Sequence, residues 1–366
     1  MTSPADVAAV LSGLTEQVRA AAAGRRPLRI RAGGTKDFYG NPTTGELLDP
    51  REYSGLVAYE PTELVLTARC GTPLVLIASV LDERGQMLAF EPPHFGASAT
   101  LGGCVAAGLA GPRRGAFVPG AGGVRDFVLG AKLLNGRAEV LSFGGTVMKN
   151  VAGYDVSRLL AGSLGTLGVV LEVSLKVAPK PVAEETRSFE LGEAAALDQC
   201  ATWAGKPWPV TATAWYGGRL HVRLSGAASA VALACDAFGG ERTGAADGAA
   251  FWAGIREQAQ PFFRRQLPLW RISLPATAPP LALPGEQLIE WGGALRWLAS
   301  GADAAQTRAR AAALGGHATL FRGNPGSAGA FTPLPPALAR IQARLKSEFD
   351  PMGIFNPGRM YADAPG

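Results

Sequence analysis

The residues best suited to binding an anion lie in a glycine loop near the start of the chain. Residues 28–31 alternate between apolar and basic side chains, which is typical of a half-buried strand, and Gly33-Gly34-Thr35-Lys36 follows directly. Two adjacent glycines allow backbone N–H groups to converge on an anion, and the threonine hydroxyl and lysine ammonium add a donor and a charge. The loop predicts a diphosphate site, although an ordinary glycine turn after a strand uses the same residue types.

A second glycine-rich segment begins a predicted helix over residues 100–108. Thr100 is a suitable N-cap, and Gly102 and Gly103 fall in the first turn, where the lack of side chains leaves room for a ligand. The free N–H groups and the dipole of a helix N-terminus favour phosphate. The alternative is a packing helix rich in alanine and glycine, in a chain that contains 48 glycines.

A third segment, residues 149–170, has the pattern KNxxGYDxxxLxxGSxGTLGVV. We expect a short helix over residues 156–161, a turn containing Gly165 and Gly168, and an alternating strand from Val169. Glycines at the start of a strand let the backbone approach another group closely. Taken without the other segments, this pattern indicates only a tight turn.

Together, the three segments resemble the flavin-binding domain of the vanillyl-alcohol oxidase/D-lactate dehydrogenase superfamily, and within it the FAD-binding subunits of bacterial glycolate oxidases. The resemblance covers residues 25–180 and a tail, residues 349–360, that looks like the family's closing Asn-Pro-Gly motif. It implies that the first two segments clasp the FAD diphosphate and that the third lies beside the adenosine part. The implied cofactor-binding residues are Arg31, Gly33, Gly34, Thr35, Lys36, Pro92, Ser98, Thr100, Leu101, Gly102, Gly103, Gly153, Asp155, Gly165, Gly168, Val169 and Asn356.

Asn356 is the implied contact to the flavin edge. An amide can donate and accept a hydrogen bond at once, which suits that edge. Without the family resemblance, the Asn-Pro sequence would indicate a turn.

Three departures from the family pattern bear on mechanism. The first glycine loop lacks the histidine through which many members attach FAD, so we expect non-covalent FAD. Cys104 replaces the asparagine that usually follows the two glycines, and we expect it to be a small core residue. The clustered histidines that give hydroxyacid-oxidising relatives a metal site and a base are missing, because His94, His221 and His317 are far apart in sequence. We therefore assign no metal site and no catalytic residue.

The missing histidine cluster favours a supporting subunit. The resemblance, which includes residues 290–297, implies a complex that oxidises glycolate, a small 2-hydroxy acid, to glyoxylate. In it, this chain would support or relay electrons from a catalytic flavoprotein subunit to an iron–sulfur subunit. Two alternatives stay open: a self-sufficient FAD-dependent oxidoreductase of another 2-hydroxy acid or alcohol, and a non-catalytic scaffold. Candidate carboxylate-binding residues, if they are not simply surface arginines, are Arg113, Arg114, Arg296 and Arg322.

Other nucleotide-binding classes are excluded by the motifs. Residues 120–125 place Arg125 where a Rossmann fingerprint needs its third glycine, and Gly205-Lys206 is followed by Pro207 rather than by serine or threonine. The formal charge of +5 is scattered without a basic run, so nucleic-acid binding is not expected.

Composition indicates a well-cored globular protein, with 47% hydrophobic and 18% charged residues. Four cysteines without metal or redox spacing suit a reducing compartment. No signal peptide and no apolar run of membrane-spanning length are evident. We expect a cytoplasmic protein without a direct membrane span, and attachment to the inner membrane through partners stays open.

The predicted elements give an α+β fold in two lobes. We expect an FAD-binding domain over residues 1–178, in which Asn135-Gly136 turns a hairpin. A cap domain over residues 179–335 should form an antiparallel sheet backed by helices, because its strands follow one another in two groups with helices over residues 193–204, 227–238 and 304–314. Residues 336–366 should return to the first domain through a helix over 336–349 and the tail.

Overall fold

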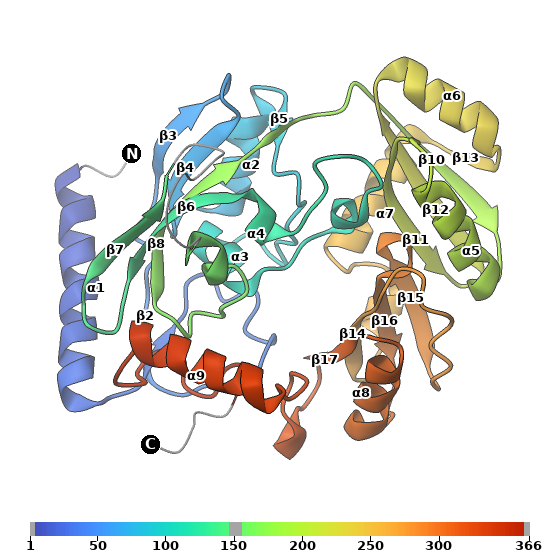
Figure 1. The fold of residues 1–366 in the computed structure, drawn as a ribbon. Coiled ribbons are helices and arrows are strands. Elements are labelled where there is room, and N and C mark those ends of the chain that lie inside the picture. Colours follow the sequence, from blue (N-terminus) through green and yellow to red (C-terminus); the bar gives the residue numbers. More distant parts are fainter. Residues whose placement is uncertain (1–3, 146–155, 362–366) are drawn as a thin grey trace.

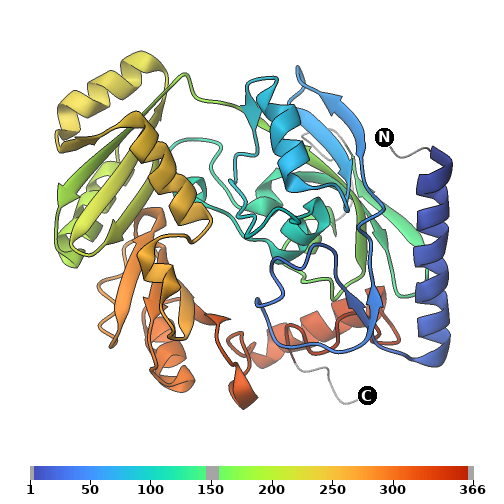
Figure 2. The ribbon, with the colours of Figure 1, turned by 180° about the vertical axis from the view of Figure 1, so that it is seen from behind.

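The computed structural model of the chain describes residues 4–145 and 156–361 (Figure 1). Two lobes lie side by side, each built on its own sheet, as the views from opposite sides show (Figure 2). One sheet has five strands in the order β3-β4-β8-β6-β7, and the other has eight in the order β13-β10-β12-β11-β15-β16-β14-β17. Neighbouring strands in both sheets are antiparallel. The predicted two-lobed α+β fold with an antiparallel cap sheet is confirmed.

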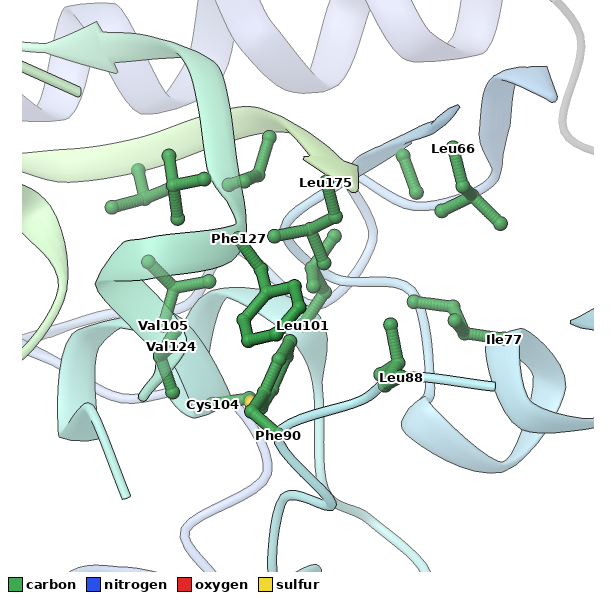
Figure 3. Close-up of a cluster of buried hydrophobic side chains, with 14 of the residues drawn as sticks. Leu66, Ile77, Leu88, Phe90, Leu101, Cys104, Val105, Val124, Phe127 and Leu175 are labelled. Carbon is green, nitrogen blue, oxygen red and sulfur yellow. The ribbon is translucent and has the colours of Figure 1, made fainter. Parts of the chain in front are cut away.

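The sheet of the first lobe is centred on β8, which is buried along nearly its whole length. Below the sheet, the rings of Phe90 and Phe127 lie 5.6 Å apart and contact the side chains of Leu101 and Cys104 (Figure 3). This core fixes the position of α3. The elements are α1 (Pro4–Gly24), β1 (Leu28–Ile30), β2 (Glu46–Leu48), β3 (Leu56–Glu60), β4 (Val65–Arg69), α2 (Leu74–Asp82), β5 (Gln86–Met87), α3 (Leu101–Ala107), α4 (Val124–Phe127), β6 (Val128–Leu134), β7 (Val140–Gly144), β8 (Val169–Lys176) and β9 (Ala178–Pro179).

The cap lobe joins two four-stranded halves into one sheet through the pairing of β11 with β15. Helices α5 and α6 form on the segments where the sequence predicts them, whereas α7 and the short strand β13 are not predicted. The elements are β10 (Ala183–Glu190), α5 (Glu193–Ala204), β11 (Val210–Tyr216), β12 (Arg219–Gly226), α6 (Ala228–Phe238), β13 (Glu241–Thr243), α7 (Ala245–Arg256), β14 (Leu269–Ser273), β15 (Glu286–Glu290), β16 (Leu295–Ala299), α8 (Ala304–Ala313) and β17 (His317–Arg322).

The two lobes share an apolar cluster. Tyr39, Ala107 and Leu109 of the first lobe pack with Trp297 and Phe321 of the cap sheet. The chain passes between the lobes at residues 180–182, because β9 still pairs with β5 and β10 begins the cap sheet. No helix within residues 4–145 and 156–361 has the length and hydropathy needed to cross a bilayer.

The end of the chain returns to its beginning. Helix α9 (Pro336–Phe349) runs along the lower edge of the first lobe in both views, and residues 350–361, here called the tail, follow it. The tail lies parallel to β1: the Leu28 N–H donates to the Ile354 carbonyl at 2.7 Å, and the Asn356 N–H donates to the Leu28 carbonyl at 2.9 Å. The tail therefore pairs alongside β1, the strand that leads into the first glycine loop.

Candidate functional site

The first glycine loop, residues 33–36, presents a run of unused backbone donors. Within the described ranges, the N–H groups of residues 32 to 36 donate to no protein acceptor, whereas the N–H of Arg31 donates to the Leu48 carbonyl on β2. A side chain at Gly33 would collide with the Ser98 carbonyl, 1.7 Å from an ideal Cβ, and Gly34 has a φ of +69°. The two glycines thus permit both the close packing against Ser98 and the turn that aligns the donors.

A cavity of about 310 Å³ borders this loop. Its walls carry four basic side chains: Arg29, Arg31, Lys36 and Arg359. Consecutive N–H donors beside cations form the surroundings that a diphosphate requires. The lining residues are Arg29, Ile30, Arg31, Ala32, Gly33, Gly34, Thr35, Lys36, Asp37, Pro42, Thr43, Thr100, Gly103, Ala106, Ala107, Leu164, Asn356 and Arg359.

A smaller cavity of about 80 Å³ lies next to this one, since Ile30, Ala32, Gly103 and Asn356 are among the residues that line both. The residues that line only the smaller one include Gly102, Gly165, Gly168 and Val169. The structure therefore brings the first loop, the start of α3, the third segment and the tail around two neighbouring cavities.

The start of α3 contributes in a different way from the one expected. Thr100 is the N-cap, as predicted, and its hydroxyl accepts from the Gly103 N–H at 3.2 Å. The Leu101 N–H donates to the Thr72 carbonyl and the Gly102 N–H to the Cys70 carbonyl. The first-turn N–H groups are therefore not free to bind phosphate. What α3 offers the cavity is space, not donors.

The third segment places its glycines against the tail. Gly165 has a φ of +71°, and an ideal Cβ there would lie 2.7 Å from Nδ2 of Asn356. A glycine is thus needed both for the turn and for the approach of the amide. Gly153 and Asp155, which the family resemblance also implies, lie outside the described residues.

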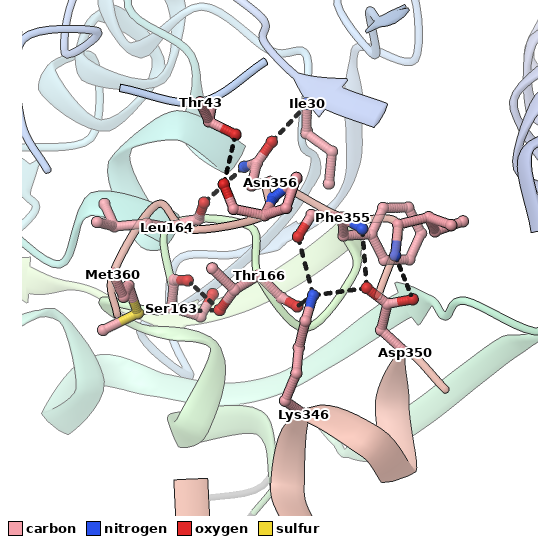
Figure 4. A network of polar contacts seen from close by, with 12 residues as sticks. Ile30, Thr43, Ser163, Leu164, Thr166, Lys346, Asp350, Phe355, Asn356 and Met360 are labelled. Carbon is pink, nitrogen blue, oxygen red and sulfur yellow. Dashed lines mark hydrogen bonds and ion pairs between the residues drawn. The ribbon is translucent and has the colours of Figure 1, made fainter. Parts of the chain in front are cut away.

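Asn356 joins two of the segments that line the cavities (Figure 4). Its Oδ1 accepts from the Ile30 N–H at 2.8 Å, and its Nδ2 donates to the Leu164 carbonyl at 2.7 Å. The side chain lines both cavities but gives these hydrogen bonds to the protein backbone. Its observed action is to hold the first strand and the third segment together.

Lys36 is the basic residue of the first glycine loop, and its side chain is partly buried. Its Nζ donates to the His94 carbonyl at 3.2 Å and lies 5.5 Å from the centre of the Phe95 ring. Burial lowers its pKa, an effect that the negative charge of Glu257 opposes. Glu257 itself accepts from the His94 and Phe95 N–H groups and thereby fixes the segment that carries them.

Of the implied residues that the structure describes, three do not line either cavity. Pro92 is buried, and Leu101 is fully buried in the core of the first lobe. Ser98 is exposed, and its hydroxyl donates to the Gly33 carbonyl at 2.9 Å. Ser98 therefore supports the first glycine loop through this hydrogen bond, and Leu101 anchors α3 in the core.

Cys104 and His221 both lie in protein surroundings that favour their neutral forms. Burial raises the pKa of the Cys104 thiol to about 11, so the core residue expected from the sequence is a neutral thiol. His221, on β12, packs against the ring of Phe251 at 4.1 Å, and burial lowers its pKa to about 4. Among the described residues, no three His, Cys, Asp or Glu side chains gather in a way that could hold a metal ion.

The four candidate arginines separate by their contacts. Arg296 is fully buried, and its guanidinium donates to the Gly293 and Ala278 carbonyls. Arg113 reaches the Ser225 hydroxyl, and Arg114 stacks on Trp291.

The side chain of Arg322, at the end of β17, has no hydrogen-bond or ion-pair partner in the part of the chain that the structure describes. Its guanidinium lies 4.6 Å from the ring centre of Phe38 and 5.5 Å from that of Phe95. Phe95 is also the ring against which Lys36 lies, so Arg322 is the candidate arginine closest in contacts to the cavity.

Arg29 and Arg359 are cavity residues that sequence reasoning did not select. Arg29 alternates with Ile30 on the predicted strand, and Arg359 directly follows the Asn-Pro-Gly motif. A search for cations next to the selected segments would have found both.

Comparisons with known proteins support FAD as the cofactor. A family model described as FAD binding domain matches residues 8–144. A solved alkyldihydroxyacetonephosphate synthase superposes over 94% of this chain and 74% of its own with a TM-score of 0.63, at 14% sequence identity, which shows the same fold. Glycolate oxidase subunit GlcD of Bacillus subtilis is 30% identical over 194 residues, 51% of this chain and 40% of that protein.

Glycolate oxidase subunit GlcE of Escherichia coli is similar over nearly its full length. The two proteins are 49% identical over 350 residues, which make up 96% of this chain and 97% of the relative. The fold is thus the vanillyl-alcohol oxidase type, with an FAD-binding domain whose donors and cations surround one cavity. The chain belongs to the GlcE family of FAD-binding glycolate oxidase subunits.

Proposed function

We propose that this chain is the FAD-binding subunit of a complex that oxidises glycolate to glyoxylate, and that it holds its FAD without a covalent bond. The observation that carries the proposal is the run of free N–H donors at residues 32 to 36 beside a cavity lined by four basic side chains. FAD, when bound, supplies the two-electron redox chemistry of the reaction. The similarity to the Escherichia coli subunit supports the choice of reaction.

Each part of the site has a proposed task. The first glycine loop, with Arg31, Lys36 and the neighbouring cations, would bind the diphosphate through backbone N–H groups and charge. Gly103 and the glycines of the third segment would leave room for the rest of the cofactor. Asn356 would keep the walls in place through its bonds to the two backbone segments.

The proposed partners are a catalytic flavoprotein subunit and an iron–sulfur subunit, between which this chain supports or relays electron transfer. Two observations support a role that depends on partners: the related protein is named as a subunit, and the described histidines form no cluster that could act as base and metal site. All four cysteines are buried free thiols, in keeping with a cytoplasmic location.

A second candidate function is a chain that binds the hydroxy acid itself and reduces its own FAD. The observation in its favour is Arg322, a half-buried guanidinium on the same aromatic ring as Lys36 and without an anionic partner among the described residues. A carboxylate is the small-molecule group that an arginine binds best, through two parallel hydrogen bonds.

One spectrum separates the candidates. The purified chain should show oxidised flavin bands at about one FAD per chain, because the free N–H donors and the four cations of the proposed diphosphate site all come from this chain. If those bands persist under anaerobic glycolate, the chain needs its partner; if they bleach, the second candidate holds. A chain that binds no flavin even when FAD is added would overturn both.

A further inference from the structure

Lys346, near the end of α9, connects three separate points of the chain (Figure 4). Its Nζ donates to the Thr166 carbonyl at 2.8 Å and to the Phe355 carbonyl at 2.9 Å, and it lies 2.6 Å from Oδ2 of Asp350. The ammonium group is therefore surrounded by three oxygen acceptors. A lysine on an exposed helix face usually has none of these fixed contacts.

Asp350 is the centre of the same network. Its side chain is fully buried, and its oxygens accept from the Ile354 and Phe355 N–H groups at 3.0 and 2.8 Å. Without Lys346, this carboxylate would be a buried negative charge that only backbone donors balance. Removing the cation from a buried ion pair is strongly destabilising, so the Lys346–Asp350 pair stabilises the conformation in which the tail turns back toward β1.

The network ends at the walls of the flavin cavities. Thr166 follows Gly165 of the third segment, and Phe355 precedes Asn356, which binds the backbones of Ile30 and Leu164. Lys346 thus holds the third segment to the tail from one side, while Asn356 joins both to the first strand from the other.

Arg359 continues these contacts to the first glycine loop. Its guanidinium donates to the Lys36 carbonyl at 3.5 Å, and to the Asp37 and Asn41 carbonyls just beyond the loop at 2.9 and 3.0 Å; Arg359 also lines the cavity of about 310 Å³. Residues 346–359 accordingly contact the third segment, through Thr166, and the first glycine loop, through Lys36.

We propose that residues 346–359 form a clasp whose docking is coupled to FAD binding, with Lys346 as its positioning residue. A ligand that contacts both glycine segments binds best when the clasp holds them in place, and by reciprocity the ligand stabilises the docked clasp. Lys346 lines neither of these two cavities. Its effect on FAD binding would therefore pass through its contacts with Thr166 and Phe355, and from Phe355 to the neighbouring Asn356. The inference rests on the flavin placement proposed above.

The first experiment measures this coupling in the unmodified full-length chain. Arg340 and Arg344 are exposed on α9 and are trypsin sites. Limited trypsin digestion of the apoprotein, with and without FAD, should show slower cleavage of the α9 and tail region when FAD is present. Equal cleavage rates in the two conditions would overturn the coupling.

The second experiment uses variants and the FAD dissociation constant, measured by flavin fluorescence. Lys346→Met should raise the constant about 10- to 100-fold, in the usual range of coupling between sites. Lys346→Arg should recover part of the affinity, since a guanidinium can reach the same oxygens. The control is Lys132→Met, which removes a lysine that pairs with Glu172 at 2.8 Å in the sheet, and this variant should keep the wild-type constant.

The outcomes distinguish the clasp from the cavity. Wild-type affinity in Lys346→Met would overturn the clasp, as would an equal loss in Lys132→Met. If Lys346→Met does not fold, the trypsin comparison on the unmodified chain decides. Retention of FAD by Gly103→Val, in contrast, would overturn the placement of the cofactor itself and leave the contacts of the clasp without a ligand to act on.

Discussion

Gly102 and Gly103 are neighbours in the first turn of α3, yet a side chain at each would meet different surroundings. An ideal Cβ on Gly102, which lines only the smaller cavity, would lie 2.7 Å from the Cβ of Cys70, a buried residue. An ideal Cβ on Gly103 would meet only the Thr100 hydroxyl, at 3.3 Å, and Gly103 lines both cavities. The first glycine serves packing, and the second leaves space for a ligand.

Gly103→Val should therefore abolish FAD binding while the chain remains folded. Its branched side chain would enter the cavity, and valine is no worse than glycine within a helix. The FAD content of the purified variant should fall from about one per chain to a small fraction, with circular dichroism unchanged. Gly102→Val, by contrast, should lower stability by about 1–3 kcal/mol through overpacking against Cys70.

The matched control is Gly13→Val. Gly13 lies in α1, and nothing comes within 4 Å of its ideal Cβ. This variant should bind FAD normally. A Gly103→Val protein with a full complement of FAD would contradict the placement of the cofactor beside α3.

The mode of FAD attachment is testable by acid precipitation. The first glycine loop contains no histidine, and the Cys104 thiol is buried and neutral. We expect all flavin in the supernatant and a colourless pellet. Yellow colour that stays with the denatured protein would mean a covalent bond.

Arg322→Gln tests the second candidate function. If Arg322 binds the substrate carboxylate, losing a charged hydrogen-bond donor should raise the KM for glycolate about 10- to 100-fold, with FAD content unchanged. The measurement is the steady-state kinetics of the assembled complex. Arg308→Gln is the control, because Arg308 also lies over an aromatic ring, that of Trp270, and its guanidinium already donates to the Ala328 and Gly329 carbonyls. Equal KM values in wild type and Arg322→Gln would exclude a substrate role for this arginine.

Glu290 makes the cap sheet sensitive to pH. Its carboxylate is buried and accepts from Nε1 of Trp297 at 2.7 Å, and burial raises its pKa to about 7. A folded-state pKa above the unfolded one means that the folded protein binds the proton more tightly. Stability from this group is thus present at low pH and is lost as the pH rises through about 7.

Glu290→Gln carries no charge at any pH and should lack this loss. Relative to wild type, its free energy of unfolding should increase by on the order of 3 kcal/mol between about pH 4 and about pH 8. Urea denaturation of both proteins at several pH values measures the difference. Parallel stability curves across that range would show that Glu290 titrates in the folded state as it does in the unfolded one.

Local sequence signals were sufficient for much of the fold. The helix over residues 193–204 and the hairpin at Asn135-Gly136 formed where composition and turn residues predicted them. Helix α7 was not predicted, because its alanine- and glycine-rich sequence has little helical periodicity and its position depends on burying Trp252 and Ile255. Strand β2 pairs in parallel with β1, a long-range contact that the intervening polar loop does not indicate.

The same distinction applies to the site. The glycine segments were found from the sequence because their residue types restrict local backbone geometry. The use of the Gly102 N–H by Cys70, and of the Asn356 amide by Ile30 and Leu164, depends on chain segments far away in sequence. No local pattern encodes those partners, so the sequence alone does not show which backbone N–H groups remain free to bind a ligand.

The pairing of Leu28 with Phe355 constrains the order in which the protein can mature during synthesis. The five-stranded sheet uses strands that end at Lys176, so it can form while the cap is still being translated. The loop after β1, however, gains its neighbour on the tail only when nearly all of the chain has left the ribosome. Contacts of such long sequence separation form late. We therefore expect FAD to load after translation, so that nascent chains stalled within the cap fold in part yet stay colourless.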